Sequence, residues 1–278
     1  MRTKPYNVFD YDGYGGLTVS FNEVCLSLGK GDVVSGDSSS SLGRYEKIAT
    51  PLTRRLANQG NANDGLSPGR ILTFPETIDE ILTSRENLPP QQDPLIGKAF
   101  HTDSSVWAGY NDAGNPIVVV SHLPTLLSNP DYLESRLKAG AYQENQGLDI
   151  SDERGREEFS RLQKLRDDKR VFVLSEEATR KLAVNQRNKP EGIASVVSHP
   201  LVSAAFGDGE RIERYFTFFG EHVSFCANGF YGNLAIPPKG IHGYFLWTRG
   251  PTSHADVATY APIGNHQVLR VRAIAPLQ

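Results

Sequence analysis

Two aspartates near the start of the chain, Asp10 and Asp12, are the residues whose type and spacing best suit chemistry. They stand in YNVFDYDG (residues 6–13), directly after a short apolar run. Side chains two positions apart on an extended segment point to the same side, so both carboxylates are expected on one face. Such a pair can hold a divalent cation, and one carboxylate can attack phosphorus. The alternative is an acidic surface turn. A calcium loop is disfavoured because Phe21 replaces the required glutamate.

Three later segments offer polar groups next to predicted element ends. Ser35 closes an apolar strand in GDVVSGDSSSS, where a hydroxyl beside a helix start suits a phosphate contact. Lys189 in NKPEGIA can neutralise a phosphoryl charge as a point cation. Asp208 in AFGDGERIER is predicted at the end of an apolar strand, where open α/β sheets bind ligands. Taken singly, the three also fit a serine-rich turn, a surface lysine and an Asp-Gly turn.

The order and spacing of these segments resemble the haloacid dehalogenase superfamily of phosphohydrolases. FDYDG is similar to its opening Asp-x-Asp-Gly, VVSG to its second motif, the lysine to its third and AFGDGE to its fourth. The fourth motif is closest to the sugar-phosphate phosphatase branch, and FFGEHVSFCANG is similar to the stretch that follows it there. The resemblance covers residues 1–60 and 185–230, and the gap between the second and third motifs implies a cap inserted after the second.

The resemblance implies a magnesium-dependent hydrolysis of a small phosphorylated metabolite. Asp10 would be the nucleophile, forming an aspartyl-phosphate, and Asp12 the acid and base. Mg²⁺ would be held by Asp10, Asp12 and Asp208. Ser35 and Lys189 would stabilise the phosphoryl oxygens.

Several positions depart from the family pattern and leave the enzymatic activity open. Tyr14 stands where the family has threonine, and Arg211 and Ile212 stand where it has Asn-Asp. The alternative hypothesis is a non-enzymatic, strand-rich binding or structural protein in which the Asp-Gly motifs are turns. A degenerate phosphatase that binds a phosphorylated ligand without turnover is a third hypothesis.

The other polar residues fit no motif. The seven histidines are scattered, and no HxH or HExxH spacing indicates zinc. His242, His254 and Tyr260 could form a hydrolase or nuclease site, but core or loop roles are favoured. Asp103 and Asp112 have no motif around them.

Composition and charge exclude some classes of protein. The 278 residues carry a net charge of −3, which gives no basic field for nucleic acid. No apolar run reaches the roughly 20 residues of a membrane span, and MRTKPYNV lacks the apolar core of a secretion signal. Cys25 and Cys226 match no metal spacing. We therefore predict a reduced, cytoplasmic protein with neither nucleic acid nor membrane as partner. A secreted protein with a trimmed signal is the alternative, and the oligomeric state is undefined.

These patterns predict the elements that would position the candidate residues. Helices are expected over 20–28, 42–60 and 151–170, a hairpin over 106–124 with its turn at 111–115, a strand over 200–206 and further strands from 215 onward. The predicted fold class is α/β, with a Rossmann-like parallel core formed by 1–60 and 185–278 and an inserted α+β cap over 61–184. The alternative is a mixed α+β fold with mainly antiparallel strands.

Overall fold

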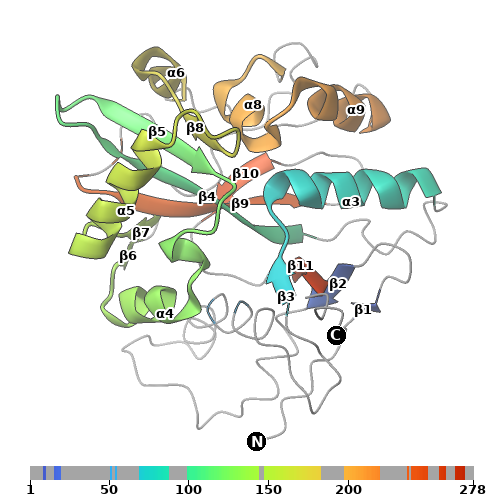
Figure 1. The fold of residues 1–278 in the computed structure, drawn as a ribbon, viewed down its shortest axis with the longest axis horizontal. Coiled ribbons are helices and arrows are strands. Elements are labelled where there is room, and N and C mark those ends of the chain that lie inside the picture. The colour runs from blue at the N-terminus through green and yellow to red at the C-terminus, as the bar shows by residue number, and fades with distance from the viewer. Residues whose placement is uncertain are drawn as a thin grey trace, which may run out of the picture.

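Strands that lie far apart in the sequence join in one sheet (Figure 1). The computed structural model describes residues 9–10, 16–19, 51, 54, 69–87, 99–143, 147–182, 197–219, 237, 239–249, 257–260 and 267–272. The strands are β1 (Phe9–Asp10), β2 (Gly16–Val19), β3 (Gly69–Ile71), β4 (Ala99–Tyr110), β5 (Pro116–Ser121), β6 (Tyr142–Gln143), β7 (Gly147–Asp149), β8 (Val171–Val173), β9 (His242–Arg249), β10 (Val257–Tyr260) and β11 (Gln267–Arg272).

The sheet is mainly antiparallel. The long strand β4 pairs antiparallel with β5 and with β9, and β9 pairs antiparallel with β7 and β10. In the described ranges, the short contact between β11 and β4 is the one parallel pairing. The prediction of a Rossmann-like parallel sheet is therefore wrong, and the alternative of a mixed, mainly antiparallel α+β fold is confirmed.

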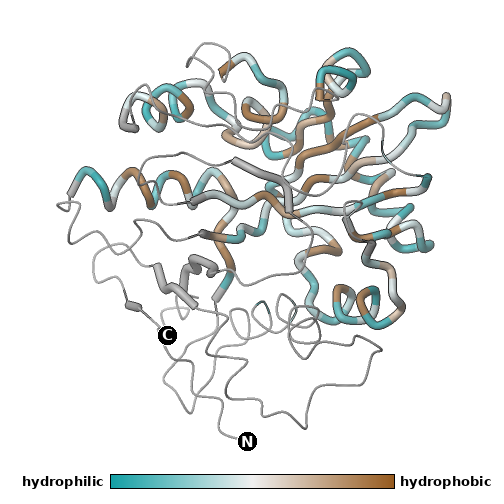
Figure 2. Tube along the Cα trace, turned by 180° about the vertical axis from the view of Figure 1, so that it is seen from behind, coloured by the Kyte–Doolittle hydropathy of each residue, from teal (hydrophilic) through white to brown (hydrophobic). Residues whose placement is uncertain are grey.

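Both faces of the central strands are buried, because alternate side chains enter two separate apolar clusters. Val106, Val118 and Leu246 belong to one cluster, whereas their neighbours Trp107, Val119 and Phe245 belong to the other. Apolar residues accordingly recur along the central strands and alternate with polar residues along the helices (Figure 2).

Helices cover each face of the sheet (Figure 1). The first cluster is closed by α3 (Phe74–Asn87), α8 (Pro200–Phe206) and α9 (Gly209–Phe219), with α6 (Glu176–Lys181) beside them. The second is closed by the 3₁₀ turn η2 (Leu126–Ser128), α4 (Pro130–Lys138) and α5 (Glu153–Lys164). A sheet covered on both sides leaves its ligand-accessible groups at strand ends and loops.

Helix α5 forms where the charged segment 151–170 predicts it. Asp152 caps it by accepting a hydrogen bond from the Gly155 backbone, and Phe159 and Leu162 are buried on its inner side. Gly155 lies so close to the Ile150 carbonyl oxygen that an added Cβ would stand 1.8 Å from it. The helix therefore needs glycine there to approach the preceding loop.

The hairpin over 106–124 is confirmed, since Ala108 of β4 pairs with Val118 of β5 around the turn at 111–115. Two expectations fail. Residues 200–206 form α8 instead of a strand, with His199 as N-cap and Pro200 in the first turn. The predicted strands from 215 onward begin only after α9, which runs to Phe219.

The predicted division into a core and an inserted cap stays a prediction. Strand β4 belongs to the predicted cap segment and β9 to the predicted core segment, and the two pair side by side. In the part of the chain that the structure describes, no helix has the length and apolarity to cross a membrane.

Candidate functional site

Strand β4 carries an irregularity at its polar run HTDSS (residues 101–105). Its pairing with β9 shifts register between His101 and Ser105. The Thr102 hydroxyl fills the gap by donating to the Leu246 carbonyl over 2.8 Å. Such bulges redirect side chains out of the regular alternation. Here the bulge turns Asp103 and Ser104 toward polar partners on neighbouring elements.

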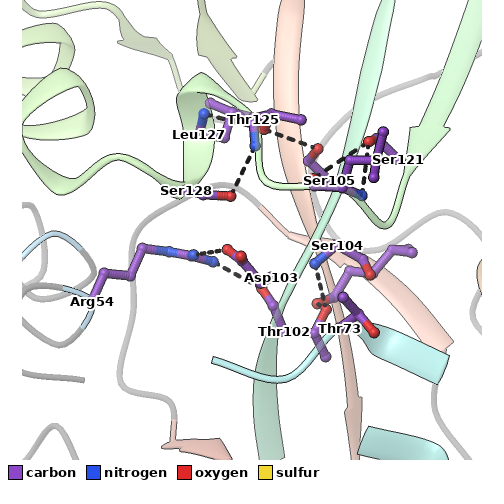
Figure 3. A network of polar contacts seen from close by, with 12 residues as sticks. Arg54, Thr73, Thr102, Asp103, Ser104, Ser105, Ser121, Thr125, Leu127 and Ser128 are labelled. Atoms are coloured by element: carbon purple, nitrogen blue, oxygen red, sulfur yellow. Dashed lines mark hydrogen bonds and ion pairs between the residues drawn. The ribbon is translucent and has the colours of Figure 1, made fainter. Parts of the chain in front are cut away.

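Asp103 forms an ion pair with the fully buried Arg54 and is itself largely buried (Figure 3). Arg54 Nη1 donates to Asp103 Oδ1, and Nη2 donates to the Thr102 carbonyl over 2.8 Å. The guanidinium also lies 3.9 Å from the centre of the Phe245 ring. Burial lowers the pKa of Arg54, and the neighbouring Asp103 carboxylate opposes that shift. The buried Arg54 charge therefore depends on Asp103, since water does not solvate the guanidinium when the carboxylate is removed.

Ser104 and His122 form a second buried contact, with Ser104 Oγ and His122 Nδ1 2.7 Å apart. His122 Nε2 lies 2.9 Å from the Ala204 carbonyl, which can only accept, so Nε2 carries the proton of the neutral ring. Nδ1 therefore accepts from the Ser104 hydroxyl. Burial lowers the pKa of His122 to about 4, outweighing the opposing effect of the Ala204 carbonyl.

A serine that donates to imidazole suggests a nucleophile and its base. Ser104 is, however, fully buried, and its Oγ also accepts from the Phe74 backbone over 2.8 Å. Because both hydrogen bonds are made to buried groups, the Ser104 oxygen is not available to a substrate. The contact instead ties β4 to the start of α3, the end of β5 and α8. We call Arg54, Thr102, Asp103, Ser104 and His122 the buried framework.

A cleft of about 510 Å³ lies over this framework, and we call it the β4 cleft. Asp103 and His122 of the buried framework reach its lining, where five segments meet. These are the β3–α3 junction, the bulge of β4, the loop after β5, the turn before β8 and the α8–α9 junction. Gly207 ends α8 with a left-handed φ of 69°, which lets the chain turn into α9 at the wall of the cleft.

Charged side chains line the β4 cleft, and most are paired. Arg70 donates to both carboxylate oxygens of Glu76, over 2.8 and 2.6 Å. Burial on its own would raise the pKa of Glu76, but hydrogen bonds from Arg70 and Thr73 lower it to about 2. The full set of charged lining residues is Arg70, Glu76, Asp103, Lys169, Arg170 and Arg211.

Two other arginines of the lining pair with carboxylates outside it. Arg211 donates to Asp79 over 2.8 and 3.0 Å and to the Phe206 carbonyl over 2.7 Å. Arg170 donates to Asp168 over 2.9 and 3.1 Å. These pairs fix the positions of the cations before any ligand arrives.

The two motif residues that the structure describes, Asp10 and Asp208, do not line the β4 cleft. Asp10 ends β1, opposite Leu17 of β2 in an antiparallel pair. Asp12, Ser35 and Lys189 lie outside the described residues, so the roles predicted for them are untested. Asp208 is exposed between two helices, where its carboxylate accepts from the Glu210 backbone over 3.0 Å. Its predicted place at the end of a strand is wrong because the preceding segment is helical.

Across the described ranges, no group of three His, Cys, Asp or Glu side chains is arranged to hold a metal ion. The buried framework was not predicted from the sequence, because Asp103 belongs to no known motif. The available signal was HTDSS itself, since five polar residues in a row inside an apolar strand indicate a bulge with buried partners.

No family model matches the chain, and no curated protein matches it. A solved structure does, described as "Accommodation of massive sequence variation in Nanoarchaeota by the C-type lectin fold". It is 22% identical, the match covers 73% of this chain and 88% of that one, and the TM-score is 0.56. The chain has a C-type lectin-like fold.

This likeness overturns the resemblance to the haloacid dehalogenase superfamily, which has a parallel core. The hydrolase, phosphatase and magnesium-binding assignments that came from the resemblance are corrected with it. The alternative hypothesis, a strand-rich binding or structural protein, fits the findings better. Uptake of Mg²⁺ as a cofactor, a phosphorylated small molecule as partner and a cytoplasmic location are predictions that no observation tests.

Proposed function

We propose that this chain is a non-enzymatic binding protein that takes its ligand in the β4 cleft. The observation that carries the proposal is the division between a fixed floor and an accessible rim. Arg54, Ser104 and His122 are buried and bonded to backbone or side-chain partners. Arg70 and Arg170 stand above them with more than half of each side chain exposed. A rigid floor under accessible polar groups suits binding, because little order has to be created when the ligand arrives.

The likeness to a solved structure supports the same proposal. That protein is described as accommodating massive sequence variation on the C-type lectin fold. A fold tolerates variation when its stability resides in buried contacts and its surface residues are free to change. In this chain the two apolar clusters and the buried framework supply the stability, and the rim of the β4 cleft supplies the recognition.

The proposal is tested by blocking the cleft without changing its charge. Pro124 is exposed on the wall of the cleft, so Pro124→Trp places an indole in the opening. Ala113→Trp adds the same group at the exposed β4–β5 turn, outside the cleft. Saturation-transfer NMR is recorded with a mixture of small carboxylates, phosphates, amines, amides and sugars.

We expect some fragments to bind the wild type and Ala113→Trp but not Pro124→Trp. Circular dichroism of each variant verifies the fold. Fragments that bind all three proteins alike, or no fragment binding at all, would contradict a ligand site in the cleft.

A further inference from the structure

The β4 cleft carries one positive charge that no carboxylate balances in the described part of the chain. Arg70 pairs with Glu76, Arg170 with Asp168 and Arg211 with Asp79, and Asp103 is taken by the buried Arg54. Lys169 lines the same cleft, is exposed, and forms no ion pair with any described residue. The chain as a whole has a net charge of −3, so a cationic cleft is a local departure from its overall charge.

The turn that presents Lys169 is held in place by its neighbour Asp168. The Asp168 carboxylate accepts from the Arg170 backbone over 2.9 Å, and its carbonyl accepts from the Val171 backbone over 2.9 Å. Lys169 and Arg170 therefore stand side by side at the start of β8, on a turn bonded at both ends. Two cations in such a turn meet an anion with little loss of backbone freedom.

The paired arginines of the rim keep donors for a ligand. Arg70 donates hydrogen bonds to Glu76 through Nη1 and Nη2, and Arg170 donates to Asp168 through Nε and Nη2. In the described part of the chain, Arg70 Nε and Arg170 Nη1 have no acceptor. Guanidinium and ammonium donors of this kind form the strong, charge-assisted hydrogen bonds that carboxylate and phosphate oxygens accept.

Apolar groups complete the wall of the cleft. Pro75, Pro124 and Phe206 line it together with the neutral ring of His122. The cleft volume of about 510 Å³ lies within the range of small-molecule sites. A ligand that fits would place an anionic group at the turn and an apolar body against these side chains.

We infer that the β4 cleft binds a small organic anion, a carboxylate or phosphate joined to an apolar body, with Lys169 as its main cationic contact. The inference rests on the proposed function, because it assigns the ligand class of the same site. It concerns binding alone and includes no chemical step.

The test uses four aromatic probes that differ in charge. Benzoate and phenyl phosphate carry the two anions, benzamide is the neutral counterpart and benzylamine the cationic one. Affinities are measured by NMR titration of the wild type, Lys169→Glu and Lys164→Glu. Lys164 is exposed at the end of α5 and does not line the β4 cleft, so its substitution makes the same charge change outside the site.

We expect benzoate or phenyl phosphate to bind the wild type more tightly than benzamide, and benzylamine not to bind. Lys169→Glu should raise the Kd of the anions at least about tenfold, while Lys164→Glu changes it less than about twofold. The two anions separate a carboxylate site from a phosphate site. Added salt should weaken anion binding and leave benzamide unchanged.

Two results would overturn the inference, and they have different meanings. Benzamide binding as tightly as the anions, with binding lost in Pro124→Trp, would leave the cleft as a ligand site but refute its anion preference. Equal loss of anion affinity in both charge-reversal variants would assign the effect to the overall charge. Failure of the proposed function is recognised separately, because fragments would then bind Pro124→Trp as well as they bind the wild type.

Discussion

Two arginine–aspartate pairs of the molecule have the same chemistry and opposite surroundings. In the buried framework, 2% of the Arg54 side chain and 14% of the Asp103 side chain are exposed. At the rim, these fractions are 64% for Arg170 and 25% for Asp168. Water solvates the rim pair whether or not it forms, so the pair contributes little to stability. The framework pair has lost that solvation, so each partner depends on the other.

The comparison separates what stabilises the fold from what is available for recognition. The framework connects β4 to α3, β5 and α8 with bonds between buried groups. The rim displays similar groups on turns and helix ends. Substitutions in the framework should therefore change stability and those in the rim should change binding.

The largest effect is expected from Asp103→Ala. It leaves the Arg54 charge buried without its partner, which lowers the free energy of unfolding by about 3–5 kcal/mol. Urea denaturation measures the change, and the matched control Asp168→Ala, which breaks the exposed pair, should unfold close to wild type. Equal loss of stability in the two variants would show that the framework pair stabilises the fold no more than the rim pair does. Arg54→Met combined with Asp103→Leu should recover most of the loss, since apolar residues of similar size replace the charges.

The next effect is a dependence of stability on pH from His122. The pKa of its folded form is depressed to about 4 from an ordinary 6.5, so its contribution is complete above pH 6.5. That contribution is lost as the pH falls through 4 and amounts to about 3 kcal/mol over the whole range. Denaturation between pH 7.5 and 4 measures it.

His122→Gln is the control for this pH dependence. His122 lies near Arg211 and Glu76, and Glu76 titrates lower, near 2. Burial raises the pKa of Glu80, with Asp79 and Glu76 adding to the shift, so Glu80 opposes the trend in both proteins. The difference between wild type and variant isolates the histidine. Parallel curves would show that His122 is not the titrating group.

A smaller effect is expected from Ser104→Ala. The hydroxyl accepts from the Phe74 backbone and donates to His122, so its removal leaves two buried groups without a partner. The free energy of unfolding should fall by about 1–3 kcal/mol. Ser160→Ala on the exposed side of α5 should change it by no more than about 0.5 kcal/mol. Chemical denaturation of both variants measures the two free energies of unfolding, and equal values would contradict a stabilising role of the Ser104 hydroxyl.

The smallest effect on stability is expected from Lys169→Ala. The side chain is exposed and forms no ion pair with the described residues, so the melting temperature should stay within about 1 °C of wild type. The same variant should lose affinity for benzoate or phenyl phosphate. A destabilised Lys169→Ala would mean that the rim and the framework are not separable.

The sequence predicted local elements better than their arrangement. The hairpin over 106–124 and helix α5 carry clear signals, a Gly/Asn turn between apolar runs and an apolar stripe on a charged segment. PLVSAAF was assigned to a strand because a short apolar run fits a buried strand and a buried helix equally. Pro200 after His199 was the signal for a helix start.

The sheet direction and the site required information that no local pattern holds. Four short motifs suggested a parallel phosphatase core, yet three of them also fit ordinary turns and the fourth a surface lysine. The pairing of β4 with β9 and the contact of Arg54 with Asp103 depend on residues brought together only by the complete fold. The polar run HTDSS indicates that Asp103 has a buried partner, but no local pattern identifies Arg54 as that partner.

The pairing of β4 with β9 also bears on how the protein is made. Thr102 donates to Leu246, which follows it by 144 residues. On the ribosome, β4 and β5 can pair as soon as they emerge, but the other edge of β4 must wait until β9 has been synthesised. That edge runs through Val106, Trp107 and Ala108, and an unpaired apolar edge invites association with other chains. Synthesis of this protein therefore includes a long interval in which a chaperone would be of most use.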